Sequence, residues 1–196
     1  MHYLDPSFII QTVGLIGIFA IVFAESGLFF GFFFPGDSLL FTAGLFAHAG
    51  YFNLEILIIG CIIAAILGDS VGYFTGSKMG PKIFKKENSL FFKKKYLLDA
   101  QEFYVKYGKK TIVLARFVPF VRTFAPIVAG VGKMSYKTFI SYNIISGIIW
   151  PLSMISLGYF VGSLFPQAEK YLFLITGGII VISIVPIVFQ IIKKRA

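Results

Sequence analysis

The sequence is short of charge, and its few charges are unevenly placed. Only 14% of its 196 residues are Asp, Glu, Lys or Arg, whereas soluble domains carry about a quarter. Residues 1–77 hold no Lys or Arg, so all 18 basic residues lie from Lys78 onward. This composition excludes an ordinary soluble domain. The lack of a basic segment before the first apolar stretch also speaks against a secretory signal.

Cysteine and histidine are also scarce. Cys61 is the single cysteine, which excludes a disulfide within the chain. With two histidines, no Ser/His/Asp set, no Walker-type loop and no metal-spaced His/Cys cluster can be assembled. The sequence therefore predicts that the protein is not an enzyme and uses no metal or other cofactor. One alternative stays open, because Glu25, Asp37 and Asp69 could supply oxygen ligands to a metal.

Apolar residues are abundant and lie in long stretches. They make up 57% of the chain, and the mean hydropathy is +0.84. These values predict an all-α polytopic membrane protein, since a helix of about 20 apolar residues spans a bilayer. The apolar stretches are 8–24, 25–50, 54–77, 111–132, 138–164 and 171–192.

The stretch 111–132 is apolar but contains Arg116 and Arg122. A guanidinium at membrane depth needs a carboxylate, a phosphate, backbone carbonyls or water. Pro119 and Pro126 make a straight helix unlikely to form here, because proline lacks an N–H group. Broken backbone at that depth survives only inside protein or beside a water-filled cavity. We therefore expect half of an anion-binding site here.

The basic clusters at 78–110 and 193–195 indicate how this stretch runs. Lysine-rich loops stay cytoplasmic, so both clusters are expected on the same side. The spans 138–164 and 171–192 already cross twice, so 111–132 is predicted to be a re-entrant hairpin that turns near Pro119 and Pro126. The alternative is one kinked helix whose arginines form structural ion pairs or reach an interface.

A short motif occurs twice, at an offset of 86 residues. Gly-Tyr-Phe-Thr-Gly-Ser at 72–77 recurs as Gly-Tyr-Phe-Val-Gly-Ser at 158–163, and Ala-Gly at 43–44 recurs at 129–130. Each copy would be a proline-broken hairpin followed by a transmembrane helix, with Pro35 and Gly36 at the first tip. Because the two copies would run in opposite directions, they predict an inverted repeat around a midplane transport site.

These patterns predict a single membrane domain, in which the side of the N-terminus stays open. A short helix at 100–107 is expected in the basic linker, because Asp99 and Glu102 have capping-box spacing. The expected parts are repeat one at about 8–77, a basic interfacial linker at about 78–110, repeat two at about 111–165 and a C-terminal transmembrane helix at about 171–192.

Charged residues of the two hairpins suggest a mechanism. If the tips meet, Glu25 and Asp37 face Arg116 and Arg122. Arginine binds phosphate with two parallel hydrogen bonds and stays charged, whereas desolvated carboxylates can take up protons. We therefore expect the arginines to bind substrate and the acids to couple transport to protons. For Asp69, near Gly68 and Gly72, a structural helix–helix hydrogen bond is the favoured interpretation.

The chain resembles the DedA family of bacterial inner-membrane proteins, which is related to VTT and SNARE-associated Golgi proteins. The resemblance implies two opposed re-entrant hairpins, with essential acids and arginines at Glu25, Asp37, Arg116 and Arg122. It also implies movement of lipids such as undecaprenyl phosphate between leaflets, and for some members proton-dependent tolerance of alkali or cationic drugs. The resembling segments are 34–40 with Glu25 upstream, 68–73, 116–122 and 129–132.

We therefore expect a flippase or scramblase for a phosphate-headed lipid, coupled to protons. Its partners would be membrane lipids and protons rather than nucleic acid, since the basic clusters flank membrane segments. It would lie in the bacterial cytoplasmic membrane as a multi-pass protein with a cytoplasmic C-terminus, and a homodimer is permitted. The alternatives are a proton-coupled small-ion or drug transporter, an assembly factor and a membrane-embedded lipid enzyme.

Overall fold

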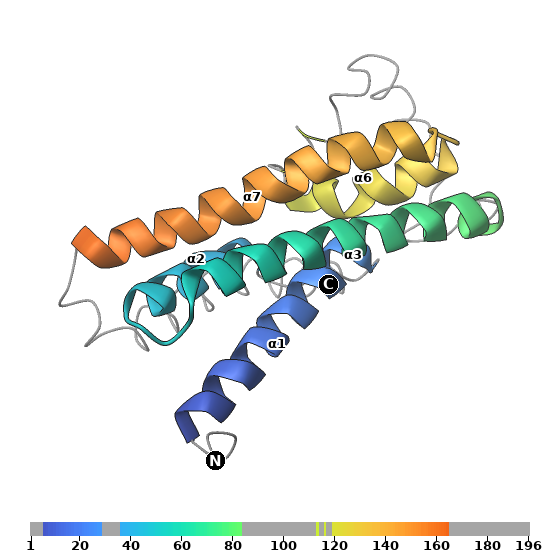
Figure 1. Ribbon diagram of the computed structural model, residues 1–196. Coiled ribbons are helices and arrows are strands. Elements are labelled where there is room, and N and C mark those ends of the chain that lie inside the picture. Colours follow the sequence, from blue (N-terminus) through green and yellow to red (C-terminus); the bar gives the residue numbers. More distant parts are fainter. Residues whose placement is uncertain (1–5, 29–35, 84–112, 114–115, 117–118, 165–196) are drawn as a thin grey trace, which may run out of the picture. The chain divides into compact units, whose positions relative to one another are not determined.

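The computed structural model describes residues 6–28, 36–83, 113, 116 and 119–164. Within these ranges every regular element is a helix (Figure 1). The helices are α1 (Pro6–Gly27), α2 (Gly36–His48), α3 (Leu54–Ile83), α6 (Pro119–Val131) and α7 (Tyr136–Leu164). The predicted helices at 8–24, 54–77 and 138–164 are confirmed, and α3 continues six residues beyond the predicted end. The predicted helices at 100–107 and 171–192 lie outside the described residues.

Among the residues that the structure describes, two helices are long and apolar enough to cross a membrane, over Leu54–Lys78 of α3 and Tyr136–Leu164 of α7. The two faces of α3 show what surrounds it. Its inward face carries buried small and aliphatic side chains, Leu57, Cys61 and Ala65. Its outward face is a stripe of exposed side chains at helical spacing, Ile56, Ile59, Ile63 and Leu67. An outward stripe this apolar suits lipid rather than water.

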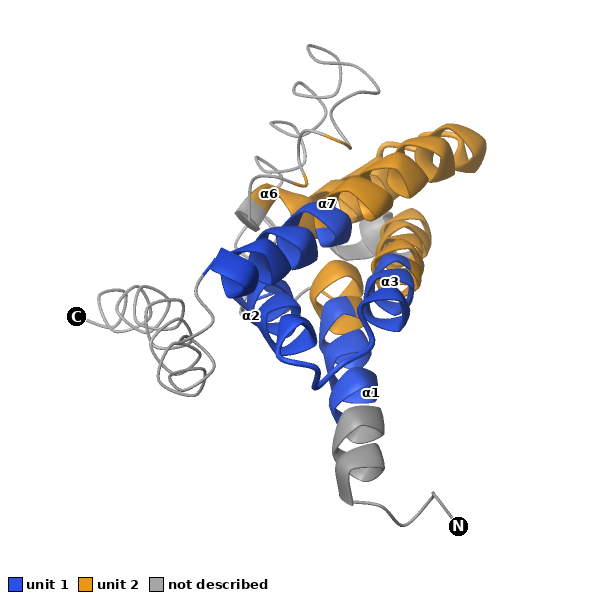
Figure 2. Cartoon of the chain, turned by 60° about the vertical axis from the view of Figure 1, so that its left-hand side comes forward, with its two compact units in different colours: residues 1–22, 33–62, 151–196 blue, residues 23–32, 63–150 orange. Residues whose placement is uncertain are grey.

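The chain forms two compact units, shown in different colours in Figure 2. Unit 1 comprises residues 1–22, 33–62 and 151–196, and unit 2 comprises 23–32 and 63–150. Unit 1 therefore combines most of α1, all of α2, the first part of α3 and the C-terminal part of α7. Unit 2 combines α6 with the C-terminal part of α3, the end of α1 and the first half of α7.

Glycines let the helices within each unit approach closely. In unit 1, a Cβ atom on Gly44 would overlap the backbone carbonyl of Ile155 in α7. In unit 2, a Cβ atom on Gly130 of α6 would overlap the backbone carbonyl of Tyr73 in α3. Small residues at a helix interface are the usual means of close packing in membranes.

The predicted placement of Pro126 at a hairpin tip is wrong, whereas Pro119 is the first residue of a helix. Helix α6 runs without interruption from Pro119 to Val131, and Pro126 lies inside it rather than at a tip. Proline suits the first position of a helix, where its missing N–H would have no partner. Pro126 is buried against Gly72, where the absent side chain leaves room for its ring. At the predicted tip of the first hairpin, Gly36 is the first residue of α2, while Pro35 lies outside the described residues.

Helix α6 ends in a turn that leads directly into α7. Lys133 adopts a positive φ of 55°. The Met134 N–H donates to the Ala129 carbonyl at 3.0 Å, and the Lys133 N–H donates to the Gly130 carbonyl at 3.1 Å. This is the hydrogen-bond pattern of a Schellman motif. It fixes the start of α7, which begins at Tyr136.

Tyr73 joins α3 to this turn. Its hydroxyl donates to the Met134 carbonyl, and its ring stacks on Phe139 with the ring centroids 4.6 Å apart. We expect Tyr73→Phe to lower the free energy of unfolding by about 1–3 kcal/mol, because the partly buried Met134 carbonyl loses its donor. Thermal unfolding in detergent measures this. The control is Tyr159→Phe, which changes the corresponding tyrosine of the second Gly-Tyr-Phe motif, a residue that is 36% exposed. An equal loss of stability in that variant would contradict a stabilising role for the Tyr73 hydrogen bond.

Candidate functional site

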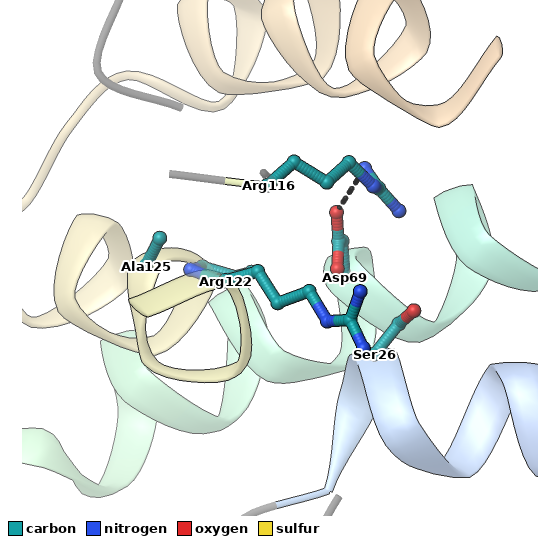
Figure 3. A pocket seen from close by; sticks show the side chains of 6 residues that line it. Ser26, Asp69, Arg116, Arg122 and Ala125 are labelled. Carbon is teal, nitrogen blue, oxygen red and sulfur yellow. Dashed lines mark hydrogen bonds and ion pairs between the residues drawn. The ribbon is translucent and has the colours of Figure 1, made fainter. Parts of the chain in front are cut away.

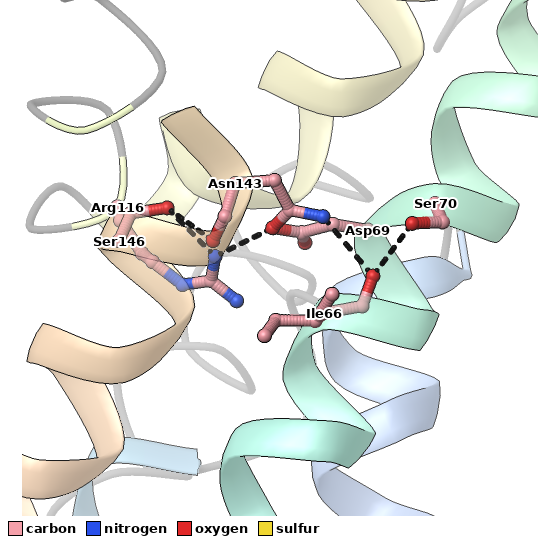
Figure 4. A network of polar contacts seen from close by, with 6 residues as sticks. All are labelled: Ile66, Asp69, Ser70, Arg116, Asn143 and Ser146. Atoms are coloured by element: carbon pink, nitrogen blue, oxygen red, sulfur yellow. Dashed lines mark hydrogen bonds and ion pairs between the residues drawn. The ribbon is translucent and has the colours of Figure 1, made fainter. Parts of the chain in front are cut away.

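Arg116 is the centre of a buried polar network in unit 2 (Figure 4). Its Nη1 donates to Asp69 Oδ2 at 2.6 Å, to Ser146 Oγ at 3.0 Å and to Asn143 Oδ1 at 3.1 Å. Asp69 comes from α3, whereas Asn143 and Ser146 lie one turn apart on α7. The arginine is only 4% exposed. A buried guanidinium is therefore held by one carboxylate and two neutral acceptors.

Asn143 has a defined orientation. Its Nδ2 donates to the Ile66 carbonyl at 3.0 Å, so its Oδ1 must be the atom that accepts from Arg116. The same carbonyl accepts a hydrogen bond from Ser70 Oγ at 2.8 Å. Asn143 is fully buried. The neutral part of the network is thus anchored on the backbone of α3.

Arg122 forms the second buried ion pair. Its Nη2 contacts Glu25 Oε1, and the two side chains are 10% and 1% exposed. Glu25 reaches this position because the end of α1 packs closely on α3. Cβ atoms at Gly27 or Gly68 would lie within 2.7 Å of the opposite backbone. The close helix contact therefore brings an acid of α1 to a base of α6.

Trp150 lies beside both guanidiniums. The Arg122 Cζ is 4.6 Å from the centroid of the indole ring and the Arg116 Cζ is 5.5 Å from it. The tryptophan is 1% exposed. Cation–π attraction to a shared, desolvated ring offsets part of the repulsion between the two positive charges.

The two arginines line a small cavity within unit 2 (Figure 3). Its lining residues are Ser26, Asp69, Arg116, Arg122, Ala125 and Pro126. In Figure 3 the Asp69 carboxyl group lies next to Arg116. The cavity has room for about one water molecule. With Glu25, the charged groups number two positive and two negative, so the site is formally neutral.

The two terminal nitrogens of Arg116 differ, because Nη1 makes all three of its hydrogen bonds. Nη2 of Arg116 is buried and has no hydrogen-bond partner among the residues that the structure describes. A guanidinium has five N–H donors, and burying one without an acceptor is unfavourable. Chemically, the arrangement can accept an oxyanion at Arg116.

Three of the four predicted site residues lie together. Glu25, Arg116 and Arg122 all belong to unit 2, whereas Asp37 lies in the first turn of α2, in unit 1, and is partly exposed. The contact of Asp37 with the arginines stays a prediction. Asp69 was expected to make a helix–helix hydrogen bond. It instead forms the ion pair with Arg116 and lines the cavity.

Sequence reasoning missed Asn143, Ser146 and Trp150. The first two carry a usable signal, because they are polar residues three apart on an otherwise apolar helix. Trp150 carries none beyond being the single tryptophan. Across the described ranges, no three His, Cys, Asp or Glu side chains gather to form a metal site.

Comparison with known proteins identifies the family. The VTT domain matches residues 34–160. Protein DedA from Escherichia coli (strain K12) is 48% identical over 182 residues, covering 91% of this chain and 83% of the relative. An uncharacterized membrane protein of Mycobacterium leprae is 42% identical, covering 95% and 83% respectively.

The name of a more distant relative includes its cellular location. Inner membrane protein YqjA from Escherichia coli (strain K12) is 31% identical, covering 88% of this chain and 78% of the relative. No solved structure matches the chain. The domain match and the identity to Protein DedA agree with the apolar outer stripe of α3. The chain is a membrane protein and belongs to the DedA family of VTT-domain proteins.

Proposed function

We propose that the protein is a lipid transporter of the flippase or scramblase class. It moves a phosphate-headed lipid such as undecaprenyl phosphate across the cytoplasmic membrane, with coupling to protons. The observation that carries this proposal is the pair of buried guanidiniums, Arg116 and Arg122, at one cavity, each facing a carboxylate. Arginine binds phosphate well, through two parallel hydrogen bonds.

The ion pairs suggest how binding and release alternate. Because the cavity is small and its charges balance, a phosphate can enter only if carboxylates give up their contacts with the arginines. Protonation of a carboxylate removes its charge and lowers the competition for a guanidinium. Lipid movement and proton movement are then linked at the same side chains. The acyl chain stays in the bilayer, so only the headgroup needs the cavity.

Packing within the two units supports the internal repeat on which this function rests. Gly44 meets the backbone of Tyr159 in unit 1, and Gly130 meets the backbone of Tyr73 in unit 2. Gly44 corresponds to Gly130 and Tyr73 corresponds to Tyr159, each at the offset of 86 residues that relates the two copies of the motif. We propose accordingly a multi-pass protein with two opposed hairpins and a cytoplasmic C-terminus, in which the transport site lies near the midplane.

The test is reconstitution into liposomes. Labelled undecaprenyl phosphate and common phospholipids are offered with and without a pH gradient, and transbilayer movement is measured. We expect the Arg116→Lys, Arg122→Lys double variant to lose lipid transport by about tenfold or more, because lysine keeps the charge but lacks the planar group. Lys137→Arg, an exposed exchange between the same residue types, should transport normally.

The outcomes separate this function from the others. Wild-type transport by the folded double variant would contradict phosphate binding by the arginines. Proton flux driven by a cation, without lipid movement, would favour the proton-coupled small-ion or drug transporter, in which the carboxylates are primary. We also propose that the lipid leaves unchanged, so a chemically altered lipid found by mass spectrometry would indicate an enzyme instead.

A further inference from the structure

Asp69 holds Arg116 through only one contact. Its Oδ2 meets Nη1, the same nitrogen that donates to Asn143 and Ser146. An isolated arginine–carboxylate pair usually forms two parallel bonds. Here the second nitrogen, Nη2, has no hydrogen-bond partner in the described part of the chain, although the residue is only 4% exposed. Asp69 therefore occupies only some of the N–H donors that Arg116 can present to an oxyanion.

Neutral groups keep Arg116 in place. Asn143 accepts from Nη1 while its own amide is anchored on the Ile66 carbonyl at 3.0 Å, and Ser146 accepts from the same nitrogen. These contacts do not depend on the charge of Asp69. If the carboxylate moves away, the guanidinium keeps its orientation and exposes a larger part of its hydrogen-bonding edge.

The lining of the cavity distinguishes the two buried acids. Asp69 is a lining residue, whereas Glu25 is not among the residues that line this cavity. An oxyanion that approaches Arg116 through the cavity therefore meets the Asp69 carboxylate first. Two anions cannot share this buried position without strong repulsion, because charges interact strongly where little water screens them.

We propose that Asp69 is an internal competitor that occupies the phosphate position on Arg116 until a phosphomonoester headgroup displaces it. This inference rests on the proposed function and adds a residue that limits affinity. Such a competitor raises the apparent Kd for the lipid, because only the fraction of molecules in which the carboxylate has left Arg116 can bind. It also favours release, because the carboxylate can return to the arginine when the lipid departs.

The experiment measures binding to the full chain in neutral detergent. Short-chain phosphatidic acid is the probe, and the emission of Trp150 is the readout. This is the single tryptophan of the chain, and its ring lies 5.5 Å from the Arg116 Cζ. We expect Asp69→Asn to lower the Kd by about tenfold, since it removes the competing charge and preserves the shape. Glu55→Gln makes the same change at an exposed position of the same helix and should leave the Kd unchanged.

Two further probes identify the ligand source. Short-chain phosphatidylcholine, whose phosphate is a diester, should bind weakly to both proteins. Inorganic phosphate should gain affinity from Asp69→Asn if the headgroup alone is recognised, and phosphatidic acid should still bind more tightly because its chains add apolar contact. Asn143→Asp is the second variant. It places another carboxylate beside Nη1, and we expect it to raise the Kd by about tenfold.

The results divide clearly. A folded Asp69→Asn protein whose Kd for phosphatidic acid is equal to or higher than that of the wild type would overturn the inference and leave the proposed function standing. If Asp69→Asn does not fold, an unchanged or lower Kd in Asn143→Asp would overturn it. Absence of binding of every phosphate probe to the folded wild type would overturn the proposed function together with this inference.

Discussion

A chain that carries both Glu25→Leu and Arg122→Met is expected to fold and to have lost lipid transport. Removing Arg122 alone leaves the Glu25 carboxylate buried, with a side chain only 1% exposed, and such a change costs about 3–5 kcal/mol. Replacing both partners with apolar side chains of similar volume is commonly neutral or stabilising. Stability should therefore return in the double variant, whereas phosphate binding should not.

The double variant also tests whether the protein is an assembly factor. If the charges merely hold helices together, an apolar pair does the same work and activity is retained. Each single variant, the double variant and Glu55→Gln would be compared by thermal unfolding in detergent and by lipid transport in liposomes. Transport by the folded double variant at the wild-type rate would refute a transport role for this pair.

The second large effect is expected on stability alone, from Gly130→Ala. The added Cβ atom would overlap the Tyr73 carbonyl and would lie 2.7 Å from the Ser77 backbone nitrogen. Because backbone atoms cannot turn aside as side chains do, α6 and α3 must separate. Overpacking costs about 1–3 kcal/mol when side chains can adjust, so we expect at least the upper part of that range.

Gly17→Ala is the matched control for this prediction. It makes the same change inside α1, where a Cβ atom meets nothing within 4 Å. Alanine is favoured over glycine in a helix by up to about 1 kcal/mol, so this variant should be as stable as the wild type or more stable. Thermal unfolding of the two variants in one detergent measures the difference. Equal unfolding temperatures would contradict the close approach of α6 and α3.

Much of the fold could be predicted because it depends on local properties of the sequence. Long apolar stretches predict membrane helices, and the start of α3 and the end of α7 coincide with the limits of those stretches. The motif shared by 72–77 and 158–163 proved to carry packing glycines, such as Gly76 and Gly158, whose Cβ atoms would overlap backbone on the facing helices. The continuity of α6 was harder to predict, because a proline usually breaks a helix and the sequence does not show that Gly72 faces Pro126.

The candidate site was predictable only in part, for a different reason. A charge in an apolar stretch must have a partner, so Arg116, Arg122 and Glu25 could be identified without a structure. Which acid pairs with which base depends on the packing of segments far apart in the chain. Asp69 and Arg116 are 47 residues apart, and no periodicity connects them. Their pairing needed the structure.

The single cysteine makes the membrane arrangement of this chain open to direct measurement. Cys61 faces inward from α3 and is 0% exposed, so water-soluble maleimides cannot reach it in the folded protein. Thiols introduced elsewhere can therefore be labelled selectively in an otherwise native chain. Cysteines would be placed one at a time at positions 78, 133 and 196 and labelled from either side of the membrane. Labelling of 78 and 133 from the same side would indicate a re-entrant segment between them, whereas labelling from opposite sides would indicate a segment that crosses the membrane.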